Sequence, residues 1–318
     1  MSTQSTPVMG KATRDAYGEA ITALGNSRQD IVVLDADLAC STKSQVFGNK
    51  FPERFFNMGI QEANMVGVAA GLASCGKLPF VSSFASFLIT KGYDQMRMGV
   101  SNPGLNVKFV GSHGGISLGE DGASQMSIED IALCVSLPGF TVLVPADEVS
   151  TRALVGAMAD DPAPGFMRTT RPKAPIVYGD DATFSIGGSN TVRDGSDVTL
   201  IAYGLMVSES LAAAEALAAK GISARVIDMY CIKPMDEAAV IKAAAETGAI
   251  VCAEEHQVKG GMGSLVAQVV AENQPVPMAF VGVEDSYAES GKPDELHEKY
   301  GLTAAHIAEQ AEKVVARK

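Results

Sequence analysis

The sequence lacks the features that would tie it to a membrane or to a covalent framework. No apolar run approaches the roughly 18 residues of a membrane span, and the N-terminal stretch has no apolar signal segment. The five cysteines are odd in number and widely spaced, with no C-x-x-C pair, so neither a disulfide framework nor a zinc site is expected. A cytoplasmic location without membrane contact is the simplest expectation.

Positive charge is also scarce. Lysine and arginine together number 25 against 37 aspartate and glutamate residues, which gives a formal net charge of −12. Such a surface repels nucleic acid and anionic lipid, so neither is expected as a partner. A phosphorylated substrate would have to be held by a local cluster of cations.

Two common phosphate-binding motifs, G-x-x-x-x-G-K-[ST] and G-x-G-x-x-G, do not occur. The glycine-rich stretch 260–263 (GGMG) is better explained as a tight turn before a helix than as a phosphate loop. His256, His297 and His306 have no metal-ligand spacing. We therefore expect structural or surface roles for them and no metal site in this chain.

What the sequence does contain is an alternation of short β-branched runs and Ala-rich amphipathic segments. Buried strands are expected at 31–36, 78–84, 107–112, 141–146, 197–204, 223–230, 249–256 and 278–285. This pattern predicts an α/β protein with two domains, each built on a mainly parallel sheet flanked by helices. The predicted boundaries are a disordered lead-in at 1–10, a first domain at 11–172, a Pro/Gly-rich linker at 173–196 and a second domain at 197–318.

One carboxylate, Glu62, stands at the start of an apolar helix within RFFNMGIQEANMVGVAAGLA. Apolar neighbours make its ionisation costly, so a burial-raised pKa is expected. These neighbours are Ile60, Met65, Val66, Val68 and Ala69. Phe84 and Phe87, three apart at a strand-to-helix turn, could clamp a flat ring beside it. Taken singly, Glu62 is more often a charge at a helix N-terminus and the phenylalanines are more often core; together they suit a cofactor with a basic heterocycle.

This stretch resembles the pyrimidine-binding domain of thiamine diphosphate enzymes, most closely that of the transketolase family, and the likeness runs from about Lys11 to about Val314. The resemblance implies that Glu62 hydrogen-bonds the ring nitrogen of the cofactor's aminopyrimidine, with Phe84 and Phe87 beside that ring. In the family this bond favours the imino tautomer, whose exocyclic nitrogen removes the thiazolium C2 proton. The second domain resembles the transketolase C-terminal domain, which supports the dimer.

The resemblance also implies a phosphate-binding set. Arg14 in ATRDAY and Arg171 at the end of MRTTR match two family arginines that grip the substrate phosphate. In DADLACS, Asp37 matches a residue near the cofactor and Ser41 offers a hydroxyl to the phosphate. Each is singly explained as a surface charge or a turn residue, and it is the agreement of distant segments that favours the shared role.

GSHGGISLGEDG resembles a transketolase loop that supplies a substrate-binding histidine and an aspartate for a sugar hydroxyl, here His113 and Asp121. Glu62 and His113 are thus the expected catalytic residues. Gln125 stands where the family has a second histidine near the reacting carbon. Glutamine forms hydrogen bonds but cannot carry a proton near neutral pH, so this change bears on which substrate is used.

The family's GDG motif, which with a later asparagine holds Mg²⁺ and the diphosphate, is absent from this sequence. The resemblance therefore implies the C-terminal half of a split, two-subunit transketolase, with the Mg²⁺ ligands on an N-terminal subunit that carries GDG. A heterotetramer of two copies of each chain is expected, and this chain alone is expected to be inactive. The reaction would move a two-carbon ketol unit from a ketose phosphate to an aldose acceptor.

Three alternatives share some of these features. The β subunit of a 2-oxo acid dehydrogenase has both domains and the glutamate, but little use for sugar contacts or paired phosphate arginines. Half of a deoxyxylulose-phosphate synthase is suggested by YDQ at 93–95. A non-catalytic paralogue would have no reason to keep Glu62 and the phosphate ligands.

Overall fold

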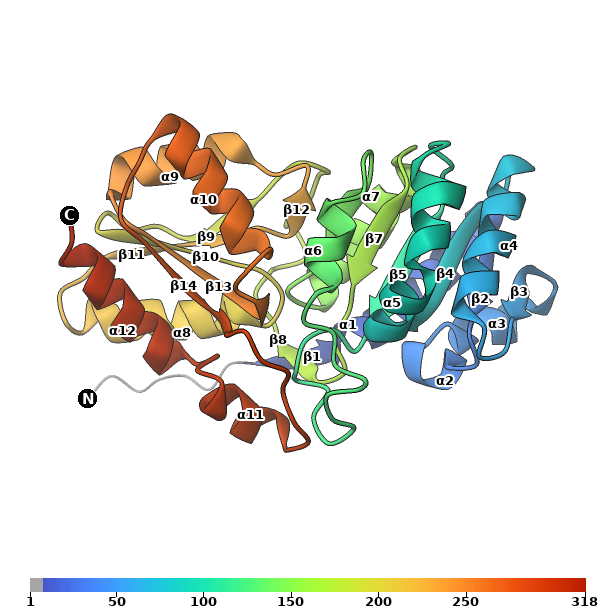
Figure 1. Ribbon diagram of the computed structural model, residues 1–318, viewed down its shortest axis with the longest axis horizontal. Coiled ribbons are helices and arrows are strands. Elements are labelled where there is room, and N and C mark those ends of the chain that lie inside the picture. The colour runs from blue at the N-terminus through green and yellow to red at the C-terminus, as the bar shows by residue number, and fades with distance from the viewer. Residues whose placement is uncertain (1–7) are drawn as a thin grey trace.

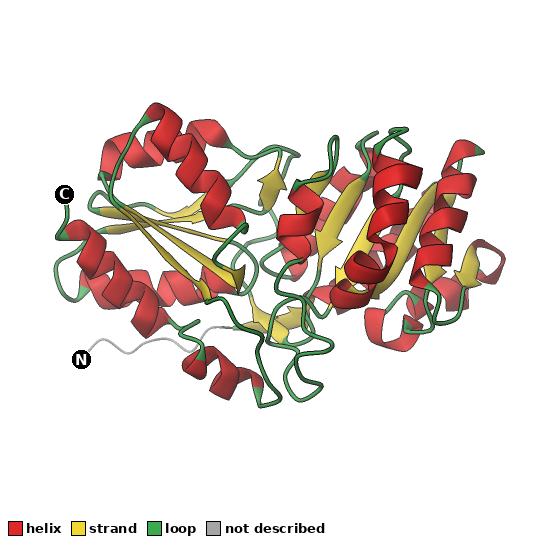
Figure 2. Cartoon of the chain, in the orientation of Figure 1, coloured by secondary structure: helices red, strands yellow, loops and turns green. Residues whose placement is uncertain are grey.

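The computed structural model describes residues 8–318, which form two α/β units side by side (Figure 1). The predicted fold class, with two domains that each hold a mainly parallel sheet flanked by helices, is confirmed (Figure 2). Over these residues, no helix is both long and apolar enough to cross a membrane.

The first domain is built on a seven-stranded sheet in the order β12-β6-β7-β5-β4-β2-β3. Its strands are β2 (Ile31–Asp35), β3 (Phe55–Asn57), β4 (Leu78–Phe84), β5 (Lys108–Ser112), β6 (Thr141–Leu143), β7 (Gly165–Arg168) and β12 (Cys231–Lys233). All pairings are parallel except that of β12 with β6. β2 and β4 are buried along their whole length, as is typical of parallel strands covered on both faces.

The helices of the first domain cover both faces of this sheet. They are α1 (Thr13–Ser27), α2 (Ala39–Thr42), α3 (Gln45–Lys50), the 3₁₀ turn η1 (Pro52–Arg54), α4 (Glu62–Ser74), α5 (Ala85–Gln95), the π-helical turn η2 (Met96–Ser101), α6 (Asp130–Val135) and α7 (Glu148–Asp160). Helix α4 packs against α5. This contact sets the start of α4 beside the residues that follow β4.

The second domain is built on a five-stranded sheet in the order β14-β13-β10-β11-β9, in which only β9 is antiparallel. Its strands are β9 (Asn190–Arg193), β10 (Val198–Ala202), β11 (Ala224–Asp228), β13 (Ile250–Gln257) and β14 (Met278–Val283). Its helices are α8 (Met206–Ala218), α9 (Glu237–Thr247), α10 (Met262–Asn273), α11 (Pro293–Lys299) and α12 (Ala304–Val315). Because α10 begins within the stretch GGMG, the expected turn before a helix is confirmed.

The chain is ordered earlier than the sequence predicts. Met9 and Gly10, expected in the disordered lead-in, belong to β1 (Met9–Ala12), which pairs with β8 (Lys173–Pro175) in a two-stranded antiparallel sheet. Val8, also in the expected lead-in, accepts a hydrogen bond of 2.9 Å from the backbone N of Ile176, and residues 1–7 lie outside the described residues. The pairing was missed because its two strands are short and far apart in the sequence.

The expected linker at 173–196 also contains regular structure, since β8 and β9 both lie within it and β9 extends the second sheet. In addition, β12 leaves the second half of the chain and joins the edge of the first sheet. There Lys233 donates hydrogen bonds to the backbone oxygens of Val135 and Leu137, at 2.8 and 2.6 Å. Hydrophobic periodicity does not reveal strands of three or four residues, because their pairing is set by distant partners.

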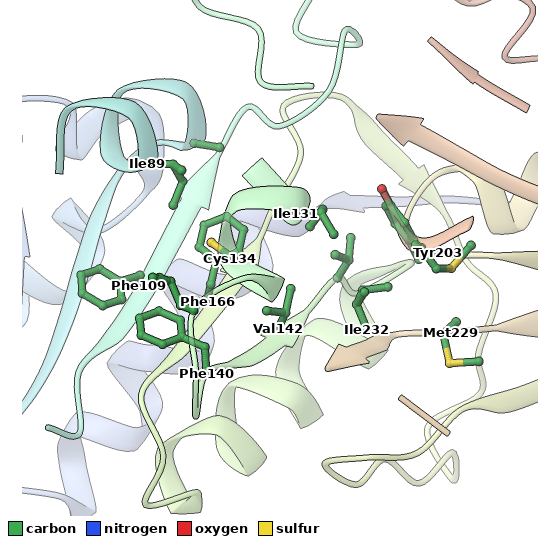
Figure 3. Packing of buried hydrophobic residues seen from close by; sticks show 14 of the residues in the cluster. Ile89, Phe109, Ile131, Cys134, Phe140, Val142, Phe166, Tyr203, Met229 and Ile232 are labelled. Atoms are coloured by element: carbon green, nitrogen blue, oxygen red, sulfur yellow. The ribbon is translucent and has the colours of Figure 1, made fainter. Parts of the chain in front are cut away.

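A continuous hydrophobic core joins the two domains. Phe109, Phe140 and Phe166 lie on the first-domain side, and Tyr203 and Met229 belong to the same buried cluster on the second-domain side (Figure 3). The rings of Phe109 and Phe140 are stacked with their centres 5.9 Å apart. The second domain is therefore held against the first by packed side chains.

Candidate active site

The predicted site residues gather at one edge of the first sheet. In a parallel sheet the carboxyl ends of all strands lie at the same edge, where ligands usually bind. The residues at this edge are Asp37 and Ser41 after β2, Glu62 after β3, Phe84 at the end of β4, His113 after β5 and Arg171 after β7. The fold thus brings together segments that are far apart in the sequence.

Glu62 opens α4, and its carboxyl group is withdrawn from solvent. The residue is only 3% exposed, and Met65 and Val66 on the next turn are fully buried. The expected apolar border is partly wrong, because Ile60 and Val68 are 70% and 36% exposed. Glu62 is buried by the packing of α4 on α5 instead.

Lys91 is the charged partner of Glu62 and was missed from the sequence. Its Nζ lies 3.9 Å from Oε1 of Glu62 and 4.5 Å from the centre of the Phe87 ring. Lys91 follows Phe87 by four residues on α5, so both side chains project from one face of that helix. This spacing in the sequence could have identified Lys91 as a neighbour of the site. Because the lysine side chain is half exposed, water weakens its attraction to Glu62 and it can move aside.

Phe84 and Phe87 form one aromatic wall. Their rings are stacked with centres 5.7 Å apart and an interplanar angle of 16°, so no third ring fits between them. The imidazole of His113 stacks on Phe84 with its centre 3.8 Å away. The expected clamp is therefore wrong: the two phenyl rings already lie against each other, and a flat ring can only lie beside them.

Two hydrogen bonds hold the ring of His113. Nη1 of Arg14 lies 3.0 Å from Nε2, and because arginine can only donate, Nε2 is the acceptor. Nδ1 then carries the proton and donates to Oγ of Ser112 at 2.8 Å. Burial, followed by the positive charges of Arg14, Arg171 and Lys43, lowers the pKa of His113 to about 3. The imidazole is consequently neutral at physiological pH.

Arg14 connects this histidine to the loop after β2. The same Nη1 donates to the backbone oxygen of Ser41 at 3.0 Å, while Nε is buried without a hydrogen-bond partner in the described part of the chain. Lys43, two residues beyond Ser41, is a further cation here, and its Nζ lies 3.5 Å from Asp15. Two positive charges and a hydroxyl on neighbouring elements suit an anion.

Arg171 connects to the loop that carries Asp121. Its Nη1 donates to the backbone oxygen of Leu118 and lies 3.4 Å from Oε2 of Glu120 and 3.8 Å from Oδ2 of Asp121. After burial and Arg14, its charge is the next contributor to the low pKa of His113, so both predicted arginines act on the same imidazole. Its ion pairs with the exposed acidic side chains are weak and can exchange for a ligand.

Asp37 and Gln125 lie at the border of this group. Asp37 is exposed, has a positive φ of 67°, and accepts a hydrogen bond of 3.1 Å from Nδ2 of Asn57, in the turn that leads to Glu62. Gln125 is half-buried, and its backbone oxygen accepts a hydrogen bond of 3.0 Å from Oγ of Ser86. In the sequence, Ser86 lies between Phe84 and Phe87. Asp37 is therefore bonded to the turn that precedes Glu62, and Gln125 to the first turn of α5.

Asp35, which was not singled out from the sequence, shapes the loop after β2. Its buried carboxyl group accepts hydrogen bonds from the backbone N of Leu38 (2.6 Å) and from the hydroxyls of Thr42 and Ser44 (both 2.8 Å). Burial raises the pKa of Asp35, and these hydrogen bonds partly offset that rise. An acid at the end of an otherwise apolar strand is the signal that could have identified it. The bonds fix the turn in which Ser41 lies.

Comparison with known protein families identifies the family of the domain that carries this sheet edge. Residues 9–176 match the transketolase pyrimidine binding domain, and residues 187–307 match the transketolase C-terminal domain. The chain belongs to the transketolase family. The sheet edge with Glu62 and His113 lies in the part that matches the pyrimidine binding domain, as the resemblance implied.

Individual transketolase relatives match over nearly the whole chain. It is 42% identical over 305 residues to the 6-deoxy-6-sulfo-D-fructose transketolase subunit SqwH of a Clostridium species, covering 96% of this chain and 95% of that protein. It is 37% identical to one subunit of the apulose-4-phosphate transketolase of Phocaeicola vulgatus, covering 96% and 98% of the two chains. A solved structure titled a split gene transketolase, inactive beta4 tetramer, is 46% identical and matches with a TM-score of 0.91 over 96% of this chain and 99% of that one. The likeness to the C-terminal half of a split transketolase is thereby confirmed.

Proposed function

We propose that this chain is one subunit of a two-subunit, thiamine diphosphate-dependent transketolase that transfers a two-carbon ketol unit from a ketose phosphate to an aldose acceptor. One observation carries the proposal: the buried carboxyl of Glu62, the aromatic wall and the cations around His113 share one sheet edge. A heterocycle and an anionic sugar can therefore bind next to each other.

The residues present suit an aminopyrimidine ring. The carboxyl of Glu62 is shielded from water, so a hydrogen bond between it and a ring nitrogen is strengthened by the low local dielectric. The wall of Phe84 and Phe87 supplies an apolar surface beside that position. Lys91 has to move aside so that Glu62 can form a hydrogen bond with the ring nitrogen. When bound, thiamine diphosphate supplies the carbon nucleophile for attack on a ketose carbonyl.

The donor is proposed to be a sugar phosphate. Arg14, Lys43 and Arg171 surround the imidazole of His113 closely enough to depress its pKa, and such a group of cations attracts a phosphate. The backbone oxygen of Ser41 accepts a hydrogen bond from Arg14, and the hydroxyl of this serine is proposed as a further phosphate ligand. Because His113 is neutral, it can hydrogen-bond a donor hydroxyl without adding charge.

Three further residues complete the proposed substrate contacts. Asp121 is proposed to accept a hydrogen bond from a sugar hydroxyl once Arg171 turns toward the phosphate. Gln125 is proposed to contact the sugar near the reacting carbon, and Asp37 to lie near the cofactor. A 2-oxo acid has no phosphate to occupy the cluster of cations, which disfavours the dehydrogenase alternative.

Mg²⁺ is proposed to be held by an N-terminal subunit with a GDG motif. Residues 8–318 contain no group of three or more His, Cys, Asp or Glu side chains placed to hold a metal ion. The related split gene structure is titled an inactive beta4 tetramer, which supports an assembly in which this kind of subunit needs a second kind of chain. We propose a heterotetramer with contacts between the two copies of this chain.

The proposal is tested by co-expression with a partner that carries GDG. Turnover of ketose phosphate donors with aldose acceptors is measured for the complex and for each chain alone, with and without thiamine diphosphate and Mg²⁺. We expect ketol transfer only from the complex with both cofactors. Activity of this chain alone, or decarboxylation of 2-oxo acids in place of ketol transfer, would contradict the proposal.

A further inference from the structure

Strand β13 contains two adjacent buried glutamates, Glu254 and Glu255, whose side chains form hydrogen bonds in different domains. Glu254 turns into its own domain, where its carboxyl group accepts hydrogen bonds from the backbone N of Met262 (2.8 Å) and of Gly263 (2.9 Å) at the start of α10. Glu255 alternates to the other side of the strand, as neighbouring residues of a strand do. It reaches across to the first domain.

Glu255 binds the loop that carries His113. Its Oε1 accepts hydrogen bonds from the backbone N of Ile116 (2.7 Å) and of Ser117 (2.6 Å), across 139 and 138 residues of sequence. These two residues lie three and four positions after His113. A second-domain carboxyl thus fixes the backbone immediately beyond a proposed substrate-binding side chain.

The two glycines between His113 and Ile116 permit this contact because they have no side chain. Gly115 has a positive φ of 79°, and a Cβ added there would overlap the carboxyl group of Glu255. A Cβ at Gly114 would overlap the guanidinium of Arg168, whose Nη2 donates to the backbone oxygen of Glu255 at 2.7 Å. The loop can lie this close to Glu255 only because both positions lack a side chain.

The backbone of His113 needs such support. Its φ is 60°, in the left-handed region that costs a non-glycine residue about 1–3 kcal/mol and persists only where the surroundings fix it. On its C-terminal side the loop is held by two backbone bonds, from Gly114 N to Thr169 O at 3.3 Å and from Gly115 N to Ser127 O at 2.7 Å, and by the two bonds to Glu255. Without Glu255, the two bonds that hold Ile116 and Ser117 are lost.

Glu255 is kept ionised in its buried position. Burial raises the pKa of its carboxyl group, but His297, whose Nε2 lies 3.6 Å from Oε1, together with Arg168 and the Ser117 N–H, lowers the pKa below its ordinary value. Burial alone would lower the pKa of His297, but the negative charge of Glu255 outweighs the effect of burial, and the pKa of His297 is raised. A charged acceptor binds backbone N–H groups more strongly than a neutral one.

We propose that Glu255 is a positioning residue for His113, through which the second domain fixes the substrate-binding histidine against Arg14 and Phe84. The activity arm of its test rests on the proposed ketol transfer; the spectroscopic arm does not.

The spectroscopic arm uses the full-length chain with labelled histidine, and the NMR signals of His113 are identified by their loss in His113→Asn. We expect the wild-type imidazole to stay neutral between pH 5 and 8. In Glu255→Ala the ring loses its fixed place, so a His113 titration appears within that range. Unchanged His113 signals in folded Glu255→Ala would overturn the proposal.

The activity arm is a double-mutant cycle in the reconstituted complex. Glu255→Ala should lower kcat/KM about 100-fold when His113 is present, as expected for a misplaced substrate contact, and less than about 3-fold in the His113→Ala background, where nothing remains to be positioned. Glu255→Gln, which keeps an acceptor oxygen, should recover most of the loss. Equal losses in both backgrounds would show a merely structural role and would overturn the proposal.

The matched control is Glu254→Gln, the neighbouring buried glutamate, whose effect should be the same with and without His113. If Glu255→Ala does not fold, Glu255→Asp takes its place, because it keeps the buried charge while drawing the oxygens away from the loop. The two proposals can fail separately. A His113 titration that appears in Glu255→Ala or Glu255→Asp would support the positioning role, even if no variant of the complex, including the wild type, transferred a ketol unit. Such a lack of ketol transfer would contradict the proposed function.

Discussion

Arg14 donates a hydrogen bond of 3.0 Å to Nε2 of His113. A permanent positive charge against an imidazole disfavours the imidazolium form, so the two side chains form a neutral acceptor and a cation side by side. An anion that binds Arg14 competes for the same N–H group. Binding of an anion to Arg14 would therefore change the hydrogen bonding of His113.

Arg14→Gln should raise the pKa of His113. The low value comes first from burial and then from Arg14, so the variant's pKa should rise above about 3 yet stay below the ordinary value near 6.5. The measurement is an NMR titration of the His113 signals from pH 3 to 8. Arg317→Gln, far along the chain at the end of the second domain, is the control and should leave the titration unchanged; an unchanged His113 pKa in Arg14→Gln would contradict the assigned contact.

Arg171→Ala should weaken the binding of phosphorylated donors. A charge-assisted hydrogen bond contributes about 1.5–3 kcal/mol, so KM should rise about 10- to 100-fold, with a smaller change in kcat. A non-phosphorylated donor should be spared. Equal losses for both donors would show that Arg171 does not hold the phosphate, and Arg152→Ala, an exposed arginine on α7, controls for lost surface charge.

Lys91→Met should leave thiamine diphosphate binding to the complex unchanged or tighten it by up to about 5-fold, since a half-exposed ion pair contributes at most about 1 kcal/mol. The reason is that Glu62 no longer has to give up a cation before it contacts the cofactor. Cofactor affinity is measured by titration of the reconstituted complex, with Lys242→Met as a surface control. Markedly weaker binding in Lys91→Met would mean that Lys91 itself holds the cofactor.

Asp228→Asn should stabilise the protein in alkaline more than in acidic solution. Asp228 is fully buried, accepts a 2.7 Å hydrogen bond from the hydroxyl of Tyr178, and has its pKa raised to about 8 by burial. The unfolded carboxyl ionises near pH 3.9, so the stability contributed by the protonated folded form is complete below that pH and is lost as the pH rises through about 8.

Asparagine cannot ionise and keeps an acceptor oxygen for Tyr178. The free energy of unfolding of Asp228→Asn should exceed that of the wild type by about 1–3 kcal/mol at pH 8.5, with a much smaller gain at pH 4.5. Urea unfolding at the two pH values measures both differences. An equal gain at the two pH values would rule out the ionisation of Asp228 as the cause, and the exposed Asp180→Asn should show no pH-dependent gain.

The sequence predicts the site to the extent that local patterns determine it. Phe84 and His113 lie at the ends of strands that the apolar pattern reveals, whereas Glu62 follows β3, a three-residue strand that was not expected. A parallel sheet collects the ends of its strands at one edge. The resemblance to transketolases implied that Arg14 and His113 bind the same substrate. The contact itself depends on the packing of α1 beside the sheet.

The remaining features depend on pairings that no local pattern records. β12 is three residues long and joins a sheet of the other domain, and Glu255 meets Ile116 across 139 residues of sequence. The expected aromatic clamp was wrong because the spacing of Phe84 and Phe87 is equally compatible with two rings stacked on each other. Side-chain partners of this kind are determined by tertiary packing, which periodicity does not encode.

Glu62 is proposed to activate a coenzyme held jointly with a second subunit, and this role is tested by the turnover of the reconstituted complex with Glu62→Ala. We expect ketol transfer to fall at least about 100-fold, as for the loss of a group that acts on a proton in the reaction, while the assembly with the partner, followed by size-exclusion chromatography, is unchanged. Near-normal turnover in an intact complex would contradict the account.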